Sequence, residues 1–517
     1  MAEIKHPGVF IEETPAGVHP IDGVPTSITA FVGRAWLGPL DQAVTIYSFA
    51  DYQRLFGGLW GESTMSFAVM QFFENGGTQA IVVRVATRSG ASAARAATIT
   101  LKQGEVFCAA SPGSWGLNLK ATIDHAGLAN PKDATLFNLT VTDDAASLRD
   151  SAKRGGSSAT ERFLSVSVDP ASPQFVGNVL EAQSQLLRAA SGLRTNSPDD
   201  QAGVTAIDGS GTDGAAIGTA EVTAPENRAA STGLYALDRT GLLNLLCIPP
   251  YVWTADNDIS ADWAPAAQYC VDRRAFLIID APACWTVANA AQQVNGFKAI
   301  ARENAALYFP RVLAPNPLDA DTLMALAPCG AVAGVMSRTD AEQGVWKAPA
   351  GVNATLRGVS GLSISMTDTE NGVLNPAGIN CLRVFPNYGP VVWGARTLAG
   401  TDAEASEWKY VPVRRFFLFL EESIYRGTQW VVFEPNDERL WARVVDTATL
   451  FLRAQWRQGA LMGNTENQSF FVTCDRTTMT QDDILNGRLI VEIGIAPIRP
   501  AEFVIFRIGQ WTASHSH

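Results

Sequence analysis

The sequence has few of the residues on which catalytic and metal sites depend. Its five histidines are His6, His19, His125, His515 and His517, four of them close to an end of the chain. A Ser–His–Asp or Cys–His arrangement needs a base held by a rigid scaffold, so only His125 could serve, and a surface histidine is the favoured interpretation. There is no HExxH motif, no Asp/Asn loop spaced for calcium and no Cys/His quartet for zinc. We therefore expect no catalytic activity, no cofactor and no bound metal.

Two other patterns could suggest a ligand site, and both have a simpler interpretation. The glycine cluster at 209–218 lacks the Gly-Lys-Ser/Thr ending of a phosphate-binding loop and follows no clear strand, so we expect a loop. The acidic pair Asp482 and Asp483 could bind a metal, but its position after 478–481 is more typical of a helix N-terminus or a turn.

Cysteine pairs, a secretion signal and long apolar runs are also missing. The seven cysteines form no CxxC pair, and Cys247 lies inside the apolar run 242–248, so we expect buried thiols in a reducing compartment. The first residues contain no apolar segment typical of a secretory signal. No run approaches the ~18 apolar residues of a membrane span. These observations predict a protein that folds in the cytosol and does not insert directly into a membrane.

Positive charge is scarce relative to negative charge. The net charge is −12, whereas binding along a nucleic-acid backbone needs clustered cationic surface, so we expect no nucleic-acid partner. With 47% hydrophobic and 17% charged residues, the composition is that of a globular protein. A length of 517 residues exceeds what one hydrophobic core usually organises and predicts several domains.

The strand and helix patterns predict a mixed α/β (α+β), multidomain fold. Apolar runs alternate with helical patterns on both sides of a long stretch rich in Ser, Gly, Ala and Thr, which predicts a mostly parallel sheet interrupted by an insertion. The expected domains are an N-terminal arm (1–25), a middle α/β domain (26–88 plus 233–350), a loop-rich inserted outer domain (89–232) and a C-terminal domain ending in a strand arm (351–517).

Individual elements follow from the same patterns. Helices are expected to begin at Ser48 and Ser63 and to end at glycine- or asparagine-containing turns. We expect strands at 27–32, 44–47, 80–85, 137–141, 163–168, 242–248, 275–279, 307–309 and 334–336. Further helices are expected at 176–190, 261–270, 288–302, 321–326 and 437–458.

Both ends of the chain carry short β-prone segments beside proline-rich stretches. A terminal strand that is apolar on both faces must be covered. Either it folds back on its own domain, or it completes a neighbour's sheet, because unpaired strand edges are templates for another chain; the pattern leaves both open. The candidate arm residues are Val9, Phe10, Ile11, Glu12 and Glu13, and Phe503, Val504, Ile505, Phe506, Arg507 and Ile508.

The helix expected at 437–458 is strongly amphipathic. One wide face is apolar, and the opposite face carries Arg439, Arg443, Arg453 and Arg457. Periodicity alone favours a solvated face whose arginines suit the helix dipole. The alternative is a contact surface for an anionic partner, because four arginines in one stripe suit carboxylates.

Two sets of motifs resemble a known family. At the N-terminus these are PGVFIEETPAGVHPIDGVPTSITAFVGRA (7–35), DYQRLFGG (51–58) and FFENGGTQAIVVRV (72–85). At the C-terminus the motif is FVTCDRTTMTQDDILNGRLIVEIGIAPIRPAEFVIFRIGQ (471–510). Together they resemble the contractile tail sheath proteins of phages and of phage-derived injection systems, over both ends of the chain and in the family's order.

The resemblance implies a structural subunit and a mechanism. Such subunits stack as hexameric rings around an inner tube, and contraction drives the tube through a target envelope. An inner core would be built from the N- and C-terminal parts, with outer domains inserted. The terminal arms would donate strands to neighbouring copies, and the four arginines would face the tube. Further partners would be baseplate and terminal cap proteins.

Alternatives remain at this point. The parallel-sheet pattern alone also suits a small-molecule-binding or catalytic α/β protein. Within the family, a phage tail and an extracellular injection particle are both open, with a slight preference for the second. Membrane-anchored secretion systems usually divide their sheath between two shorter chains, which this single chain does not match. We expect assembly in the bacterial cytoplasm, as part of a phage tail or of a cytoplasmic or released injection particle.

Overall fold

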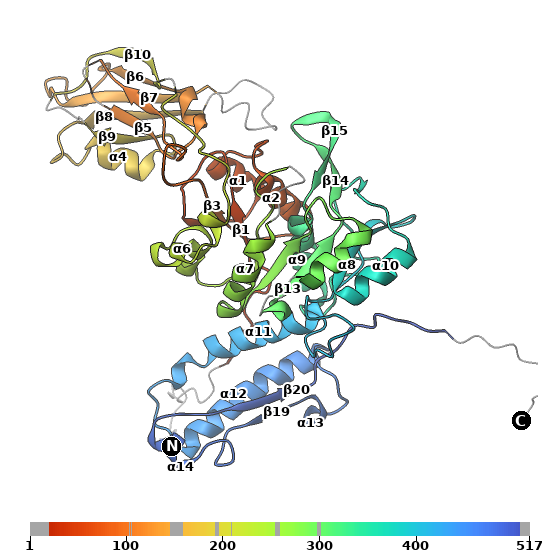
Figure 1. Cartoon of the computed structure of the whole chain (residues 1–517). Coiled ribbons are helices and arrows are strands. Elements are labelled where there is room, and N and C mark those ends of the chain that lie inside the picture. The colour runs from red at the N-terminus through yellow and green to blue at the C-terminus, as the bar shows by residue number, and fades with distance from the viewer. Residues whose placement is uncertain are drawn as a thin grey trace, which may run out of the picture. The chain divides into compact units, whose positions relative to one another are not determined.

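The structure is a computed structural model of the chain. It describes residues 20–102, 104, 106–144, 159–191, 196–207, 209–253, 259–296 and 301–506. The described chain divides into two compact units, Thr26–Arg415 and a C-terminal domain that joins residues 416–506 with residues 20–25. Both units contain helices and sheets (Figure 1), which confirms the expected mixed α/β fold.

An eight-stranded sheet organises the larger unit. All but its two outermost strands run parallel, as the alternating pattern predicts. Its central strands are continuous apolar runs because helices cover both faces. In spatial order the strands are β18 (Gly389–Val392), β17 (Ile379–Phe385), β13 (Ala305–Phe309), β12 (Phe276–Asp280), β11 (Leu245–Cys247), β1 (Thr29–Gly33), β3 (Ala80–Arg84) and β2 (Ala43–Ile46).

Side chains on alternate faces of β1 contact different helices. Phe31 packs edge-on against Phe72 of α2, with ring centroids 5.6 Å apart. Ala30 and Val32 instead belong to a core shared with the helices of the opposite face. The helices beside the sheet are α2 (Thr64–Glu74) and α9 (Cys329–Gln343) on the first face, and α7 (Ser260–Asp272), α8 (Val287–Gly296) and α10 (Asp368–Leu374) on the second.

Local helix signals confirm two predicted boundaries. The hydroxyl of Ser48 accepts a hydrogen bond from the Asp51 N–H at the start of α1 (Phe49–Phe56). That helix ends at Gly57, whose φ of 85° is the left-handed conformation that glycine adopts at little cost. In the same way Ser63 caps α2 through the Ser66 N–H. These boundaries depend on neighbouring residues only, so the sequence reveals them.

The predictions for 321–326, 334–336 and 176–190 were wrong. The first segment lies in strand β15 (Asp319–Leu326) and the second in helix α9. α9 is buried on every side along most of its length, and such a helix has no amphipathic pattern to distinguish it from a buried strand. It packs tightly on α2, because a Cβ atom at Gly330 or Gly334 would overlap a carbonyl oxygen of that helix. In the third segment, helix α4 (Val176–Gln183) is followed by strand β9 (Leu187–Ser191).

Residues 351–415 differ from the expected domain division. They were assigned to the C-terminal domain, but β17 pairs in parallel with β13 of the large sheet. The compact unit therefore extends to Arg415. The larger unit also contains η3 (Arg302–Asn304), β14 (Val312–Asn316), β16 (Gly361–Leu362) and η4 (Asn375–Ala377), with β14 pairing both β15 and β16.

The insertion holds more regular structure than its composition predicts. It contains a three-stranded and a four-stranded antiparallel sheet. Side chains of both sheets meet in one apolar core around the buried Trp115. Its elements are β4 (Thr98–Thr100), β5 (Val106–Ala109), η1 (Ser114–Asn118), β6 (Leu119–Asp124), β7 (Leu136–Asp143), β8 (Ala159–Ser167), α4, β9 and β10 (Gln201–Thr205), followed by α5 (Thr219–Val222), α6 (Glu226–Ala230) and η2 (Gly233–Arg239).

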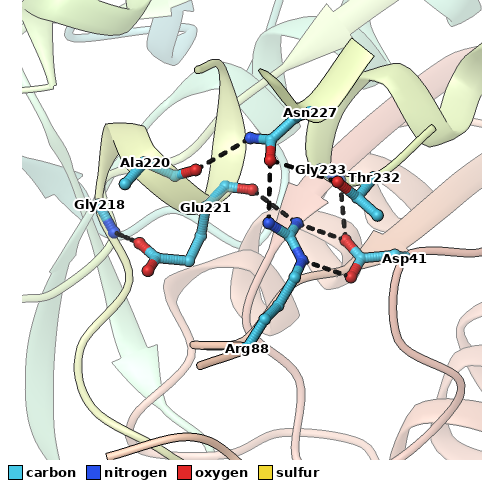
Figure 2. Close-up of polar contacts among 8 residues, drawn as sticks. All are labelled: Asp41, Arg88, Gly218, Ala220, Glu221, Asn227, Thr232 and Gly233. Carbon is cyan, nitrogen blue, oxygen red and sulfur yellow. Dashed lines mark hydrogen bonds and ion pairs between the residues drawn. The ribbon is translucent and has the colours of Figure 1, made fainter. Parts of the chain in front are cut away.

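A polar cluster joins the two ends of this insertion (Figure 2). Arg88 donates from Nε and Nη2 to the Asp41 carboxylate, at 2.7 and 2.6 Å. It also donates to the Asn227 side chain and to the Glu221 carbonyl, at 3.1 and 2.8 Å. Asp41 accepts in addition from the Gly233 N–H at 2.7 Å. Since Arg88 precedes the insertion and Gly233 follows it, one carboxylate fixes both ends.

A second buried carboxylate, Asp340 on α9, holds the first and last residues of the larger unit. Thr26 donates its hydroxyl hydrogen to Asp340 Oδ2 at 2.6 Å. Arg415 donates to both oxygens of Asp340, at 3.0 and 2.6 Å, and to the Thr26 carbonyl at 2.9 Å. The Arg415 and Asp340 side chains are only 3% and 4% exposed, so this ion pair lies in a region of low dielectric constant.

Candidate assembly interface in the C-terminal domain

The C-terminal domain is built around the long helix that the sequence predicts. α12 begins after Asp437, whose carboxylate accepts from the N–H groups of Arg439 and Leu440 at 3.0 and 2.9 Å. Its buried face includes Leu440, Trp441, Val444, Ala448, Phe451 and Leu452. The elements of the domain are α11 (Val411–Gly427, which begins in the larger unit), η5 (Gln429–Val431), α12 (Glu438–Arg457), α13 (Glu466–Ser469), β19 (Phe470–Thr473), α14 (Gln481–Leu485) and β20 (Glu492–Ile495).

The sheet of this domain has only two strands in the described chain. β19 and β20 pair antiparallel, from Phe470 opposite Ile495 to Thr473 opposite Glu492. Within the residues that the structure describes, no third strand pairs with either of them. A two-stranded sheet is marginal by itself, and its outer N–H and C=O groups can pair with another strand. The outer edges of this sheet are therefore open to further pairing in the described chain.

A groove with a volume of about 730 Å³ lies beside this sheet. Leu489, Val491 and Ile493, which alternate along the chain, line it. Its other side comes from α11, α12 and the connection between them, and most of the lining side chains are apolar: Ile424, Val431, Val432, Phe433, Leu440, Val444 and Ala448. A strand with apolar side chains would bury them here.

The N-terminal end of the described chain, from residue 20 onward, is fixed on α11. Ile21 is buried and lies against Gly427, where a side chain would overlap it. The Val24 N–H donates to the Ser423 hydroxyl at 3.2 Å. The candidate arm residues 9–13 precede this segment and lie outside the described residues.

The C-terminal segment is extended and uncovered. Residues 501–506 form no helix or strand and run away from the domain (Figure 1). Phe503, Val504, Ile505 and Phe506 are 69%, 70%, 80% and 84% exposed. We expected a strand here; an extended segment becomes a strand only when its backbone pairs with another. Arg507 and Ile508 lie outside the described residues.

The four arginines of α12 have different surroundings. Arg439 and Arg457 are exposed. Arg443 donates to Glu434 at 3.0 Å and lies over the Trp430 ring. Arg453 binds Glu466 through two hydrogen bonds of 2.7 and 2.9 Å, and the hydrogen bond from Arg453 is the main cause that lowers the pKa of the Glu466 carboxyl. Two of the four charges are thus already paired within the domain.

The acidic pair Asp482 and Asp483 lies at a helix start, as the favoured interpretation predicted. Thr480 caps α14 by accepting from the Asp483 N–H, and Asp483 accepts from the Thr480 N–H in return. Hydrogen bonds from Thr480 lower the pKa of Asp483. In the described ranges no group of three or more His, Cys, Asp or Glu residues could hold a metal ion. Nor does any described helix have the length and apolar character to cross a membrane.

The structure also gives His125 two polar neighbours that sequence reasoning missed. His125 lies between Asp200, 2.6 Å from Nδ1, and Ser197, 3.0 Å from Nε2. They meet because β6 and β10 pair antiparallel, which places the residue after β6 beside those before β10. The connectivity is that of a Ser–His–Asp triad. However, the Asp200 side chain is 72% exposed, so water screens the charge that would orient and stabilise the imidazole.

Two family profiles match the chain. The phage tail sheath protein central domain matches residues 200–398, and the phage tail sheath C-terminal domain matches residues 403–510. Together they cover more than half of the chain. The tail sheath protein of Vibrio phage KVP40 is 26% identical over 182 residues, which are 34% of this chain and 25% of the phage protein. The chain thus matches about a quarter of that relative's length.

Solved structures resemble the chain over almost its whole length. The helical sheath of the anti-feeding prophage in the contracted state is 26% identical, with 98% of this chain and 99% of that chain covered and a TM-score of 0.57. A chain from the 6-fold symmetrised baseplate of the same prophage is 25% identical, with 98% and 100% covered and a TM-score of 0.56.

Proposed function

Because the chain belongs to the contractile tail sheath family, we propose that it polymerises as stacked hexameric rings around an inner tube and contracts to drive that tube through a target envelope. The observation that carries the proposal is the C-terminal domain, where a two-stranded sheet and an apolar groove accompany an exposed apolar tail. The sixfold symmetry of the similar prophage baseplate supports a hexameric ring. Baseplate and terminal cap proteins would contact the two ends of the stack.

The terminal arms would link the subunits by strand donation. Residues 503–508 of one copy would pair with the sheet of another, and residues 9–13 would occupy a second such position. The exposed side chains Phe503 and Ile505, or their neighbours Val504 and Phe506, would fill the groove beside β20. Donated strands can stay paired while the subunit bodies move. Contraction would then release energy by forming new interface, at about 2.5 kcal/mol per 100 Å² of apolar area before entropic costs.

Electron microscopy of the purified chain tests the proposal. The proposal requires striated tubes with sixfold rings, or addition to tubes when the inner tube protein is supplied. The rival function, a small-molecule-binding or catalytic α/β protein, instead requires a small closed oligomer that never forms tubes. An injection particle is the preferred setting over a phage tail, and it is supported by the sheaths of the anti-feeding prophage and of an extracellular contractile injection system, which match 98% and 99% of this chain. Neighbouring capsid genes would contradict this preference, whereas ATPase and toxin genes would support it. Assembly in the bacterial cytoplasm is part of the proposal.

The arginine stripe of α12 is proposed to face the tube. Arg439 and Arg457 are its exposed members, so the double variant Arg439→Glu/Arg457→Glu is expected to reduce co-sedimentation with the tube protein about tenfold, which corresponds to ~1.4 kcal/mol. Charge reversal replaces attraction to an anionic surface by repulsion. The matched control is Lys132→Glu/Arg162→Glu, which changes the charge equally on exposed residues of the insertion. Equal losses in both variants would leave the stripe as a solvated face.

We also propose that the protein has no hydrolase activity despite the His125 cluster. A fluorophosphonate probe is expected not to label Ser197, because water screens the exposed Asp200 carboxylate from the imidazole. His125→Ala is expected to shift the melting temperature by less than about 1 °C, as an exposed pair contributes little. Mass spectrometry of the probed parent protein and of probed His125→Ala measures the labelling of Ser197. Labelling of Ser197 that disappears in His125→Ala would overturn the proposal.

A further inference from the structure

A cavity of about 380 Å³ lies at the carboxyl ends of the parallel strands β11, β12 and β13. Trp253 follows β11, Trp285 follows β12, and Arg311 follows β13 directly before β14; all three line the cavity. Ligands of open α/β sheets bind at this edge, because the loops that leave the strands surround a crevice there. The cavity shares no residue with the groove of the C-terminal domain.

Arg311 is the polar group that defines this cavity. Its residue is 8% exposed, and its Nε and Nη2 atoms have no hydrogen-bond partner in the part of the chain that the structure describes. These two N–H groups point from the same edge of the guanidinium plane, which is the edge that binds both oxygens of a carboxylate. Leaving buried donors of a charged group unpaired is unfavourable. The geometry is therefore suited to an anion that enters the cavity.

The Asp280 carboxylate attracts Arg311 but makes no hydrogen bond to its Nε or Nη2 atom. Asp280, the last residue of β12, accepts from the Cys329 N–H at 2.7 Å through Oδ1, and its Oδ2 has no described partner. No direct salt bridge joins it to Arg311 among the described residues, although the two opposite charges attract each other. Burial raises the pKa of Asp280 to about 6, so its negative charge is itself disfavoured there. The Nε and Nη2 donors of Arg311 therefore remain available to a ligand.

The walls of the cavity are aromatic and fixed in position. The Trp253 indole N–H donates to the Gly61 carbonyl, and its ring packs edge-on against Phe67 at 5.2 Å. Trp285 packs edge-on against Trp263 at 6.0 Å. The Arg311 carbonyl accepts from the Ser363 N–H at 2.9 Å. A site whose walls are already ordered loses little entropy when it binds. Phe309, Met324 and Ile364 complete the apolar lining.

We propose that this cavity binds an organic monocarboxylate with an aromatic or branched apolar body. One guanidinium edge matches one carboxylate, whereas a phosphate would need more donors than the apolar lining provides. The body of the ligand would lie between the indoles of Trp253 and Trp285. This binding goes beyond polymerisation and does not depend on it. The carboxylate can belong to a free small molecule or to a side chain or terminus of another protein.

Calorimetric titration of the full chain with 3-phenylpropionate tests the site. Saturable binding is expected, and 3-phenylpropionamide, which has the same shape without the charge, is expected to bind at least about 30-fold more weakly. Arg311→Met should raise the Kd for the carboxylate by a similar factor of about 30. Equal affinity for acid and amide, unchanged affinity in Arg311→Met, or no saturable binding of the acid at millimolar concentrations would each overturn the proposal.

Two further measurements keep the test decisive. Arg311→Met is expected to melt no lower than the parent protein, because replacing an unpaired buried charge by an apolar side chain is not destabilising. If that variant fails to fold, Arg311→Lys takes its place, because lysine keeps the charge but lacks two parallel N–H donors. It is expected to bind the carboxylate more weakly than the parent protein. Equal affinity would overturn the proposal. Repeating the titration on assembled tubes distinguishes the source. Binding retained in tubes indicates a free ligand, and binding lost there indicates a carboxylate supplied by another chain.

Discussion

Deleting residues 502–517 is expected to abolish tube formation and to leave a folded single subunit. The side chains of Phe503, Val504, Ile505 and Phe506 are largely exposed in the single chain, so their removal uncovers no core of their own. If another copy buries them, each contributes roughly 1.5–3 kcal/mol to the contact between subunits. Because every contact along a polymer would lose these contributions to its free energy, we expect the polymer not to form. Sedimentation velocity and electron microscopy measure the outcome.

The matched control is a deletion of residues 513–517, which removes the tail and keeps the apolar segment. This variant should form tubes like the parent. Circular dichroism and the melting temperature of both deletions should equal those of the parent chain. Tubes of normal appearance from the longer deletion would show that this arm does not connect the subunits. An unfolded protein would show that the segment belongs to its own domain.

Replacing Asp340 by alanine is expected to destabilise the larger unit by about 3–5 kcal/mol, because it leaves the Arg415 guanidinium buried without its partner. Asp340 makes two hydrogen bonds to Arg415 and one to Thr26. Both charged side chains are less than 5% exposed, so water cannot replace the lost contacts. A chain of several domains need not unfold in one step. The measurement is therefore hydrogen exchange on α9, together with the melting transition of this unit.

Two controls distinguish the effect of a buried unpaired charge from a general sensitivity of the protein to substitution. The double variant Asp340→Leu/Arg415→Met removes both charges and should recover most of the lost stability, since apolar replacements of a buried pair are often neutral. Asp51→Ala breaks the exposed pair with Arg54, whose side chains are 30% and 56% exposed. The loss of that pair, apart from the Ser48 cap, should lower the melting transition far less than Asp340→Ala does. A double variant as unstable as Asp340→Ala would show that packing, rather than charge, is responsible.

The parts of the fold that sequence patterns predicted are those determined by near neighbours. The caps at Ser48, Ser63 and Asp437 depend on residues two or three positions away. The amphipathic face of α12 depends only on the spacing of apolar residues within that helix. By contrast, α9 is surrounded by protein, and its glycines are required by α2, more than 250 residues earlier in the chain. β15 is a strand because β14 pairs with it, which no local pattern specifies.

The candidate sites divide in the same way. The alternation of Leu489, Val491 and Ile493 is visible in the sequence, and these side chains do line one groove. Periodicity placed Arg453 in a stripe but could not reveal Glu466, which comes back to it after a turn. Arg311 carries no signal at all, because its significance comes from burial without a partner. His125 gained its neighbours only through the pairing of β6 with β10.

The cluster around Asp41 and Arg88 has a consequence for how this protein can diversify. The chain leaves and re-enters the parallel sheet at the same carboxylate (Figure 2), so the inserted module begins and ends at neighbouring points. Domains with neighbouring ends can be inserted or replaced without disturbing the host domain. A lineage could exchange this module for one of different size or chemistry without shifting the register of any strand beneath it. The inserted module and the sheet that carries it can therefore evolve at separate rates.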